Sequence, residues 1–180
     1  MKTIVFLLCI LALPLSAKSP DPVILRKTVQ TAEHYGLDPQ FVIDLVEAES
    51  SFRPDLICDD TNGDAIGLLQ LTPPLWEDMV KDQGLDLKVH ATIVSINLEE
   101  GCAYLATIKG WLEKEGQFSY RNLAIAYNGG FGRFKRNSFQ IGNWWWNHPN
   151  RMYRQIIREQ RQYGPYIVLG EETLGFDEKI

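Results

Sequence analysis

The spacing of the apolar residues is the feature of this sequence that most restricts its fold. From Asp21 onward, apolar side chains recur every three or four residues, and Gly or Pro interrupts the pattern at intervals. The pattern predicts helices over residues 21–36, 39–52, 75–83, 92–115, 119–128 and 147–163. Residues 53–65 are polar and rich in turn-forming residues, which predicts a loop. Strand-like alternation is confined to a short piece near residues 166–169, so the predicted fold is mostly α.

The first 17 residues have the pattern of a secretory signal peptide. Lys2 provides a charged start, residues 4–15 are apolar, and Ser16 and Ala17 provide small residues before the expected cleavage site. The apolar run is shorter than the roughly 20 residues that span a bilayer. We therefore expect export to the periplasm or the outside, with no integral membrane segment once the signal is removed.

The composition restricts the partners of the mature chain. The formal net charge of the full sequence is −5 at pH 7, and removal of Lys2 with the signal makes the mature chain more negative still, which argues against nucleic acid as a partner. The chain that remains after residue 17 is long enough for one domain with a core and too short for two ordinary ones. Residues 168–180 are acidic and are expected to form a flexible tail.

Glu49 is the anomalous residue of the helix expected over residues 39–52. On a helical wheel the apolar residues form one continuous arc, and Glu49 falls in its middle, whereas Glu47 and Asp44 lie outside it. A carboxyl group that faces a core costs free energy unless it is paired or protonated. We therefore expect desolvation to raise the pKa of Glu49, and an acid that keeps its proton can donate it to a leaving glycosidic oxygen. The helical wheel alone is equally consistent with a structural role, in which Glu49 is buried and bonds the backbone or a distant Arg.

Four segments resemble, in order, the signature segments of the soluble lytic transglycosylase domain, a glycoside hydrolase family 23 group that includes goose-type lysozymes. They are residues 49–54, 67–73, 97–105 and 126–130. The resemblance covers residues 28 to 160. It implies a lysozyme-like, goose-type helical domain, assigned here to residues 18–167, with a cleft for alternating N-acetylglucosamine and N-acetylmuramic acid.

The resemblance also implies a mechanism in which Glu49 is the catalytic acid and base. Glu49 would protonate the glycosidic oxygen, then take the proton of the muramic acid 6-hydroxyl while that oxygen closes on the anomeric carbon. The product would be a 1,6-anhydro sugar. Because the nucleophile belongs to the substrate, no second carboxylate is obligatory, unlike in most glycosidases. No cofactor or metal is predicted.

Further positions are assigned to substrate binding by the same resemblance. They are Gln70, Tyr127, Asn128, Leu69, Cys58 and Tyr153. Gln70 is expected to bond an acetamido group, and Tyr127 to place its hydroxyl near Glu49. Leu69 would contribute mainly backbone to the cleft floor. Packing or helix capping is the alternative role for each of them.

Cys58 stands where the family commonly has a Ser that contacts the substrate. A thiol is a poorer hydrogen-bond partner, so affinity for substrate is the property most affected. Cys58 and Cys102 remain after signal removal, in a compartment where a disulfide can persist. The sequence leaves open a disulfide between them or two small buried residues kept as thiols.

Two further groups of residues have both functional and structural interpretations. Trp144, Trp145 and Trp146 could stack on sugar rings or pack in the core. Arg residues at helical spacing predict a basic face on the last helix, which is either solvated or attracts acidic stem peptides or a partner. They are Arg151, Arg154, Arg158 and Arg161.

The expected function is therefore cleavage of the β-1,4 bond between N-acetylmuramic acid and N-acetylglucosamine in peptidoglycan strands. One alternative is a goose-type-lysozyme-like hydrolase in which Asp59, Asp60 or Asp64 positions a water molecule. A second is a non-catalytic peptidoglycan-binding assembly protein. By analogy with small exported members of the family, secretion, conjugation or pilus machinery is a further candidate partner.

Overall fold

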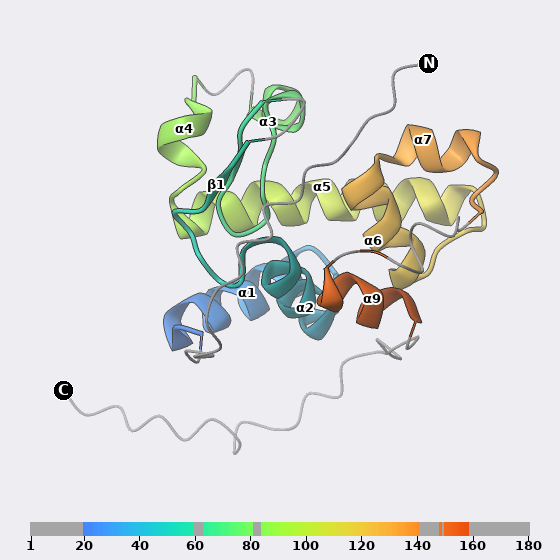
Figure 1. The fold of residues 1–180 in the computed structure, drawn as a ribbon, viewed down its shortest axis with the longest axis horizontal. Helices are drawn as coiled ribbons and strands as arrows, with labels where there is room; N and C mark the ends of the chain where they lie inside the picture. Colours follow the sequence, from blue (N-terminus) through green and yellow to red (C-terminus); the bar gives the residue numbers. More distant parts are fainter. Residues whose placement is uncertain (1–19, 60–62, 81–83, 141–147, 149, 159–180) are drawn as a thin grey trace.

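The computed structural model describes residues 20–59, 63–80, 84–140, 148 and 150–158, and it is mostly helical, as predicted (Figure 1). The signal peptide, the tail, the strand-like piece at 166–169, the three consecutive Trp residues and Arg161 lie outside these residues. The elements, in chain order, are α1 (Pro22–His34), α2 (Pro39–Ser50), β1 (Ile57–Cys58), β2 (Ala65–Ile66), α3 (Pro73–Val80), α4 (Leu87–His90), α5 (Val94–Lys114), α6 (Tyr120–Gly129), α7 (Phe131–Arg136) and α9 (Arg151–Arg158).

The prediction of an unbroken loop over residues 53–65 was wrong. β1 and β2 form a short antiparallel hairpin in which Ile57 pairs with Ile66 and Cys58 with Ala65. Each strand is two residues long, too short to show an alternating pattern. The short helices α4 and α7, of four and six residues, were missed for the same reason.

The predicted start of α2 is confirmed in atomic detail. Asp38 caps the helix, with its Oδ1 accepting the backbone N–H of Phe41 at 3.1 Å, and Pro39 follows as the first helical residue. The helix ends at Ser50 because Ser51 and Phe52 both adopt left-handed backbone conformations, with φ of 51° and 60°. Glu49 therefore lies in the last turn of α2.

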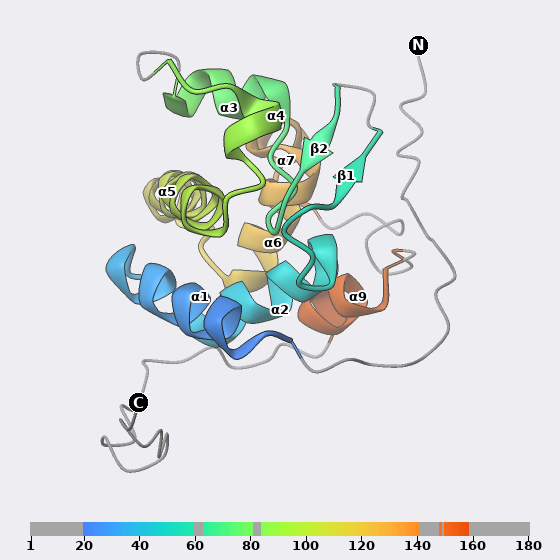
Figure 2. The same ribbon diagram turned by 90° about the vertical axis from the view of Figure 1, so that its left-hand side faces the viewer.

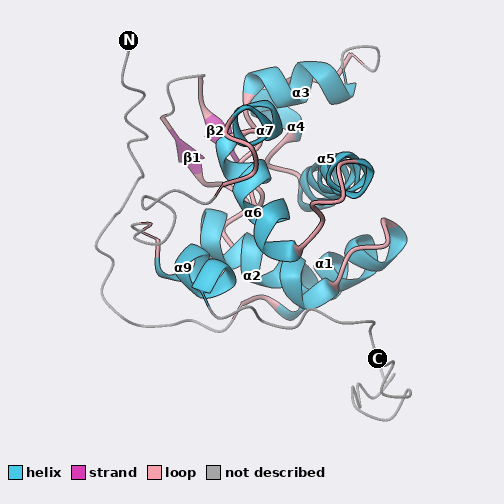
Figure 3. Ribbon diagram, turned by 90° about the vertical axis from the view of Figure 1, so that its right-hand side faces the viewer, coloured by secondary structure: helices cyan, strands magenta, loops and turns pink. Residues whose placement is uncertain are grey.

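The long helix α5 runs across the width of the molecule (Figure 1) and lies at one side of it when seen end-on (Figure 2), where it contacts α1, α3 and α6. Seen along α5, helices α1, α2 and α9 lie side by side on one side, and α3, α4 and the hairpin lie on the other (Figure 2). Figure 3, the opposite view, shows α6 between these two groups. Helix α2 contacts both α1 and α9, and α6 contacts both α5 and α9. Across the described residues, no helix is both long and apolar enough to cross a membrane.

The core is formed by the apolar faces of α2, α5 and α6. Removing each large aliphatic or aromatic side chain from water contributes about 1.5–3 kcal/mol before the entropy of ordering is counted. The largest contributors are fully buried or nearly so: Phe41, Leu45, Leu98, Leu105, Ile108 and Leu123.

Residues 66–71, called the inner loop here, are attached to α5 by the buried side chain of Asn97. Its Nδ2 donates to the carbonyls of Ile66 at 3.0 Å and Ala91 at 2.8 Å, and its Oδ1 accepts the Leu69 N–H at 2.8 Å. Gly67 makes this approach possible, because a Cβ there would lie 2.2 Å from Asn97 Nδ2 and 2.3 Å from the Ala91 oxygen. Gly67 also has φ of 82°, in the left-handed region that favours glycine.

The second contact of the inner loop with α5 is apolar. Gly101 leaves room for the Leu69 side chain, since a Cβ at position 101 would lie 2.3 Å from Leu69 Cδ1. Leu69 is fully buried as a result. The inner loop is thus fixed on α5 by one amide side chain and one apolar contact.

The possible disulfide between Cys58 and Cys102 is not formed, because the structure holds both residues as thiols. Cys102 is buried on α5, and burial, followed by the charge of Glu99, raises the pKa of its thiol to about 12. Cys58 belongs to β1, which lies on the far side of β2 from α5 (Figure 2). The hairpin register therefore places β2 between the two cysteines.

We predict that Asn97→Ala lowers the free energy of unfolding by about 3 kcal/mol, because three buried backbone groups lose their partner. Chemical denaturation followed by circular dichroism measures the loss. Asn122→Ala is the matched control, since the Asn122 side chain bonds only the Gln117 carbonyl at an exposed position and should cost less than about 1 kcal/mol. Equal losses in the two variants would contradict the role given to Asn97.

Candidate active site

Glu49 lies half-buried in the last turn of α2, between fully buried neighbours. The wheel placed it correctly on the inward side, but the carboxyl group is not sealed in the core. Glu47 is exposed, as expected for a residue on the opposite side of α2. Glu49 therefore keeps part of its surface exposed.

The helical wheel gave no indication that Asp44 is buried. Its side chain is buried, with 2% of its surface exposed, and it accepts a hydrogen bond from Gln40 Nε2 at 2.8 Å. A wheel represents one isolated helix, whereas α2 is covered by both α1 and α9. Asp44 is therefore buried although it lies outside the apolar arc, whereas Glu47 is exposed.

Tyr153 of α9 donates its phenolic hydrogen to Oε1 of Glu49. The hydrogen bond places Tyr153 beside Glu49, while its contact with substrate stays a prediction. The side chain is 1% exposed. Burial, the charge of Glu49 and the hydrogen bond to Glu49 all raise the pKa of Tyr153 well above its ordinary value. Tyr153 is therefore a permanent hydrogen-bond donor to the carboxyl group at neutral pH.

Asn128, near the end of α6, contacts Tyr153 on the other side. A side-chain hydrogen bond from Asn128 lowers the pKa of Tyr153, opposing the larger effect of burial. Its Oδ1 is buried and accepts no hydrogen bond from the described part of the chain. An unsatisfied buried acceptor costs roughly 1–3 kcal/mol, and an N–H group of a bound ligand would recover this cost.

The Tyr127 hydroxyl donates to the Leu69 carbonyl at 2.7 Å. Its expected position near Glu49 agrees with the pKa of Tyr127, which burial raises most and the charge of Glu49 raises further. Tyr127 therefore joins α6 to the inner loop beside Glu49. The Tyr127 hydroxyl therefore has a hydrogen-bond partner within the protein when no substrate is bound.

The residues of the inner loop use their polar groups mainly to fix the loop itself. Leu69 gives its amide to Asn97 and its carbonyl to Tyr127, and its buried side chain only packs. Gln70 has φ of 48°, and its Nε2 donates to the carbonyls of Gly67 at 2.9 Å and Leu56 at 3.3 Å. Binding of substrate by Gln70 or by the Leu69 backbone stays a prediction.

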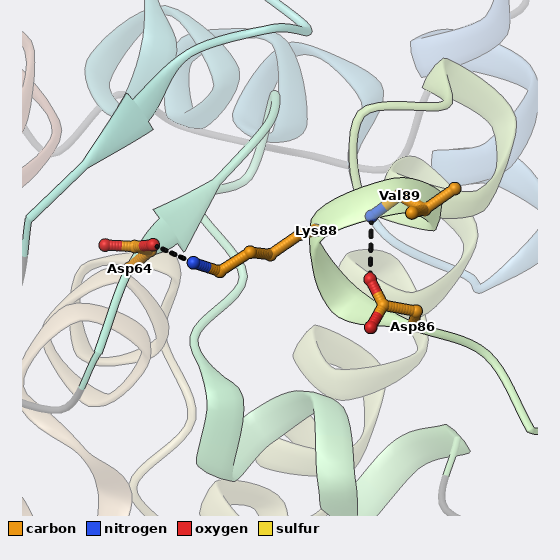
Figure 4. Close-up of polar contacts among 4 residues, drawn as sticks. All are labelled: Asp64, Asp86, Lys88 and Val89. Atoms are coloured by element: carbon orange, nitrogen blue, oxygen red, sulfur yellow. Dashed lines mark hydrogen bonds and ion pairs between the residues drawn. The ribbon is translucent and has the colours of Figure 1, made fainter.

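The hairpin carries the remaining candidate residues. Cys58 is partly exposed, and its contact with substrate stays a prediction. Asp59 is exposed, and Asp60 lies outside the described residues. Asp64 pairs with Lys88 of α4 at 3.0 Å, next to the Asp86 carboxylate that caps α4 through the Val89 N–H (Figure 4). Among the described residues, no group of three or more His, Cys, Asp or Glu could hold a metal ion.

Sequence reasoning missed two residues beside Tyr153. Asn150 caps α9, so this helix begins at Arg151, although the sequence pattern predicted a start at Asn147. His148 is fully buried, with its ring centroid 4.8 Å from that of Tyr153. An Asn before a helical pattern is a known capping signal, whereas nothing in the sequence marks His148 as buried.

The basic face predicted for the last helix is only partly solvated. Arg151 is exposed. Arg154 is half-buried, and its Nη1 donates to the His148 carbonyl at 2.6 Å. Arg154 therefore helps to hold the segment that precedes α9.

Comparison with known proteins relates the chain to enzymes that act on murein. The family model described as the transglycosylase SLT domain matches residues 28–143. The membrane-bound lytic murein transglycosylase C of Shigella sonnei is 29% identical over 125 residues, which cover 63% of this chain and 34% of the relative. The protein of the same name from Klebsiella pneumoniae strain 342 is 30% identical over 114 residues, covering 59% of this chain and 31% of the relative. The chain thus spans about a third of the length of these curated relatives.

The X-ray structure of an inactive mutant of the lytic transglycosylase Slt from Pseudomonas aeruginosa is a further match. It covers 77% of this chain and 21% of that chain, with 24% sequence identity and a TM-score of 0.49.

We predict that the stability of the protein falls as the pH drops from about 6.5 to about 4, in part because of His148. Burial, assisted by the positive charge of Arg154, lowers the pKa of His148 from 6.5 to about 4. Between these values the unfolded chain binds more protons than the folded one, so protonation favours unfolding. Replacing the imidazole in His148→Gln should reduce the pH-dependent loss by an amount on the order of 2 kcal/mol.

Chemical denaturation at a series of pH values measures this effect. His34→Gln, at the exposed end of α1, is the control for the loss of any histidine. If the His148 variant retains the full wild-type slope between pH 4 and 6.5, the buried neutral imidazole is not a source of the acid sensitivity.

Proposed function

Because the chain belongs to the transglycosylase SLT domain family, we propose that it is an exported lytic transglycosylase that cleaves the glycan strands of peptidoglycan. The observation that carries the proposal is the hydrogen bond from buried Tyr153 to half-buried Glu49. It provides a carboxyl group of fixed orientation on a side chain that stays partly exposed. The names of the curated relatives agree with this activity.

In the proposed reaction, Glu49 is first an acid and then a base. Its proton passes to the glycosidic oxygen as the bond between that oxygen and the anomeric carbon of N-acetylmuramic acid breaks. The Glu49 carboxylate then takes the proton of the 6-hydroxyl as that oxygen bonds to the same anomeric carbon. The proton returns to Glu49, no water is consumed, and the product end is a 1,6-anhydro sugar.

Tyr153 supports the second half of this cycle. When Glu49 has given up its proton, the Tyr153 O–H donates to a charged acceptor, and such a bond is stronger than one between neutral groups. The bond therefore stabilises the carboxylate after proton transfer. Asn128 would accept an N–H of the substrate beside Tyr153 once binding opens access to its Oδ1, which is buried in the free protein. An acetamido group carries such a donor.

The alternative of a goose-type-lysozyme-like hydrolase requires a second carboxylate to position a water molecule. The ion pair with Lys88 directs Asp64 toward α4, and Asp59 is exposed on the hairpin. These contacts favour the single-carboxylate reaction. The alternative of a non-catalytic binding protein gives no reason for a buried donor aimed at Glu49.

The proposal includes a location and a role. The signal-like first 17 residues support export to the periplasm, where peptidoglycan lies. Local opening of the wall for a secretion, conjugation or pilus machine is the role that we propose by analogy with small exported members of the family.

We predict that the mature protein releases fragments ending in 1,6-anhydro-N-acetylmuramic acid from purified peptidoglycan, and that Glu49→Gln abolishes the release. The amide keeps the size of the side chain but cannot exchange the proton. Mass spectrometry identifies these ends because they are lighter by one water molecule than hydrolysed ends. Glu47→Gln, an identical change on the exposed side of α2, is the matched control and should retain wild-type activity.

Two outcomes would contradict the proposal. Fragments with ordinary reducing ends would identify a hydrolase. Equal loss of activity in the two Gln variants would show that a general change in α2, not the chemistry of Glu49, is responsible.

A further inference from the structure

Asn150 connects the helix that carries Glu49 with the helix that carries Tyr153. Its Nδ2 donates to the carbonyl of Ala48 at 2.7 Å, one residue before Glu49. Its Oδ1 accepts the N–H groups of Met152 at 2.8 Å and Tyr153 at 3.3 Å. One carboxamide therefore contacts the backbone on both sides of the Tyr153–Glu49 hydrogen bond.

Each of these contacts provides a hydrogen-bond partner for a backbone group at the end of a helix. The last four carbonyls of a helix and the first four N–H groups have no partner within it. Near the end of α2, the Glu47 carbonyl accepts the Ser51 N–H at 3.0 Å, and the Ser50 carbonyl accepts the Arg53 N–H at 3.2 Å. The left-handed conformation of Phe52 ends the regular ladder that would otherwise supply a partner for the Ala48 carbonyl. Asn150 supplies that partner from another helix while capping α9.

This double cap has a geometric consequence for the site. Ala48 and Asn150 are separated by 102 positions in the chain, so no short connection sets the distance between the two helix ends. The Tyr153 hydroxyl reaches Glu49 only if this distance is held. A planar carboxamide bonded at both ends holds it within hydrogen-bond tolerance.

We propose that Asn150 is a positioning residue that fixes the Tyr153 hydroxyl against the Glu49 carboxyl. Asn150 acts through Tyr153 and takes no part in proton transfer itself. The consequence for turnover rests on the proposed function, whereas the geometric claim does not.

Asn150→Ser is the variant that separates the two contacts. A Ser hydroxyl still caps α9, because Ser and Asn are comparable at this position, but it is too short and has no amide to reach the Ala48 carbonyl. The variant should fold, and it adds no charge near Glu49. Asp86→Ser also places Ser at a helix cap, that of α4, where the side-chain bond of Asp86 is to the Val89 N–H of the same helix, and it serves as the control.

The first readout needs no activity. Carbon NMR of the Glu49 carboxyl follows its titration in the wild type, Asn150→Ser, Tyr153→Phe and the double variant. A hydrogen bond donated to the carboxylate favours the charged form, so its loss should move the titration midpoint upward by roughly half a pH unit or more. Because Asn150 acts through Tyr153, the Ser replacement should cause no further movement when Phe already occupies position 153.

The second readout is the kinetics of glycan cleavage. Asn150→Ser should lower kcat roughly 10- to 100-fold with little change in KM, and the limb of the pH profile that reports Glu49 should move in the same direction as the NMR midpoint. Asp86→Ser should keep the wild-type profile.

The two readouts distinguish the possible failures. An inactive wild type overturns the proposed function, while the NMR titrations still decide the positioning claim. An unchanged Glu49 midpoint in Asn150→Ser, or an equal shift with Tyr and with Phe at position 153, overturns the claim even if cleavage proceeds.

Discussion

The three hydrogen bonds of the Asn97 side chain are the interaction on which the rest of the site depends. They fix the inner loop on α5, which is the longest of the described helices. The fixed loop presents the Leu69 carbonyl that anchors Tyr127, and Tyr127 joins α6 to the loop. Since α6 also carries Asn128 beside Tyr153, the position of the loop determines one wall around Glu49. The Asn97 side chain thus helps to position the residues around Glu49 without contacting Glu49 itself.

A second amide performs a comparable task where α2 meets α9. Helix ends leave backbone groups without partners, and burial makes each unsatisfied group costly. In this protein, the single side chain of Asn150 bonds backbone groups at the end of α2 and at the start of α9. The proposed reaction takes place beside the same helix ends, where the chain turns through Ser51 and Phe52 in left-handed conformations. Stability and function therefore depend on the same few contacts.

The sequence predicted the elements with long periodic patterns and the partly buried position of Glu49. Helix α2, its Asp38 cap and the inward position of Glu49 follow from local rules about spacing and capping. The proximity of Tyr153 to the site followed from resemblance alone. Asp44, Asn97 and His148 could not be interpreted locally, because their burial depends on elements far along the chain. The hairpin was missed because two-residue strands are too short to show an alternating pattern.

The central claim is that Glu49 first donates a proton and then takes one back, in a reaction in which the substrate supplies its own nucleophile. The most direct test is cleavage of peptidoglycan in water enriched in the heavy oxygen isotope, with the new chain ends analysed by mass spectrometry. Our account predicts that the new ends of N-acetylmuramic acid contain no label, because the 6-oxygen of the same sugar forms the new bond. Heavy oxygen at the anomeric carbon of those ends would contradict it, since water would then be the nucleophile.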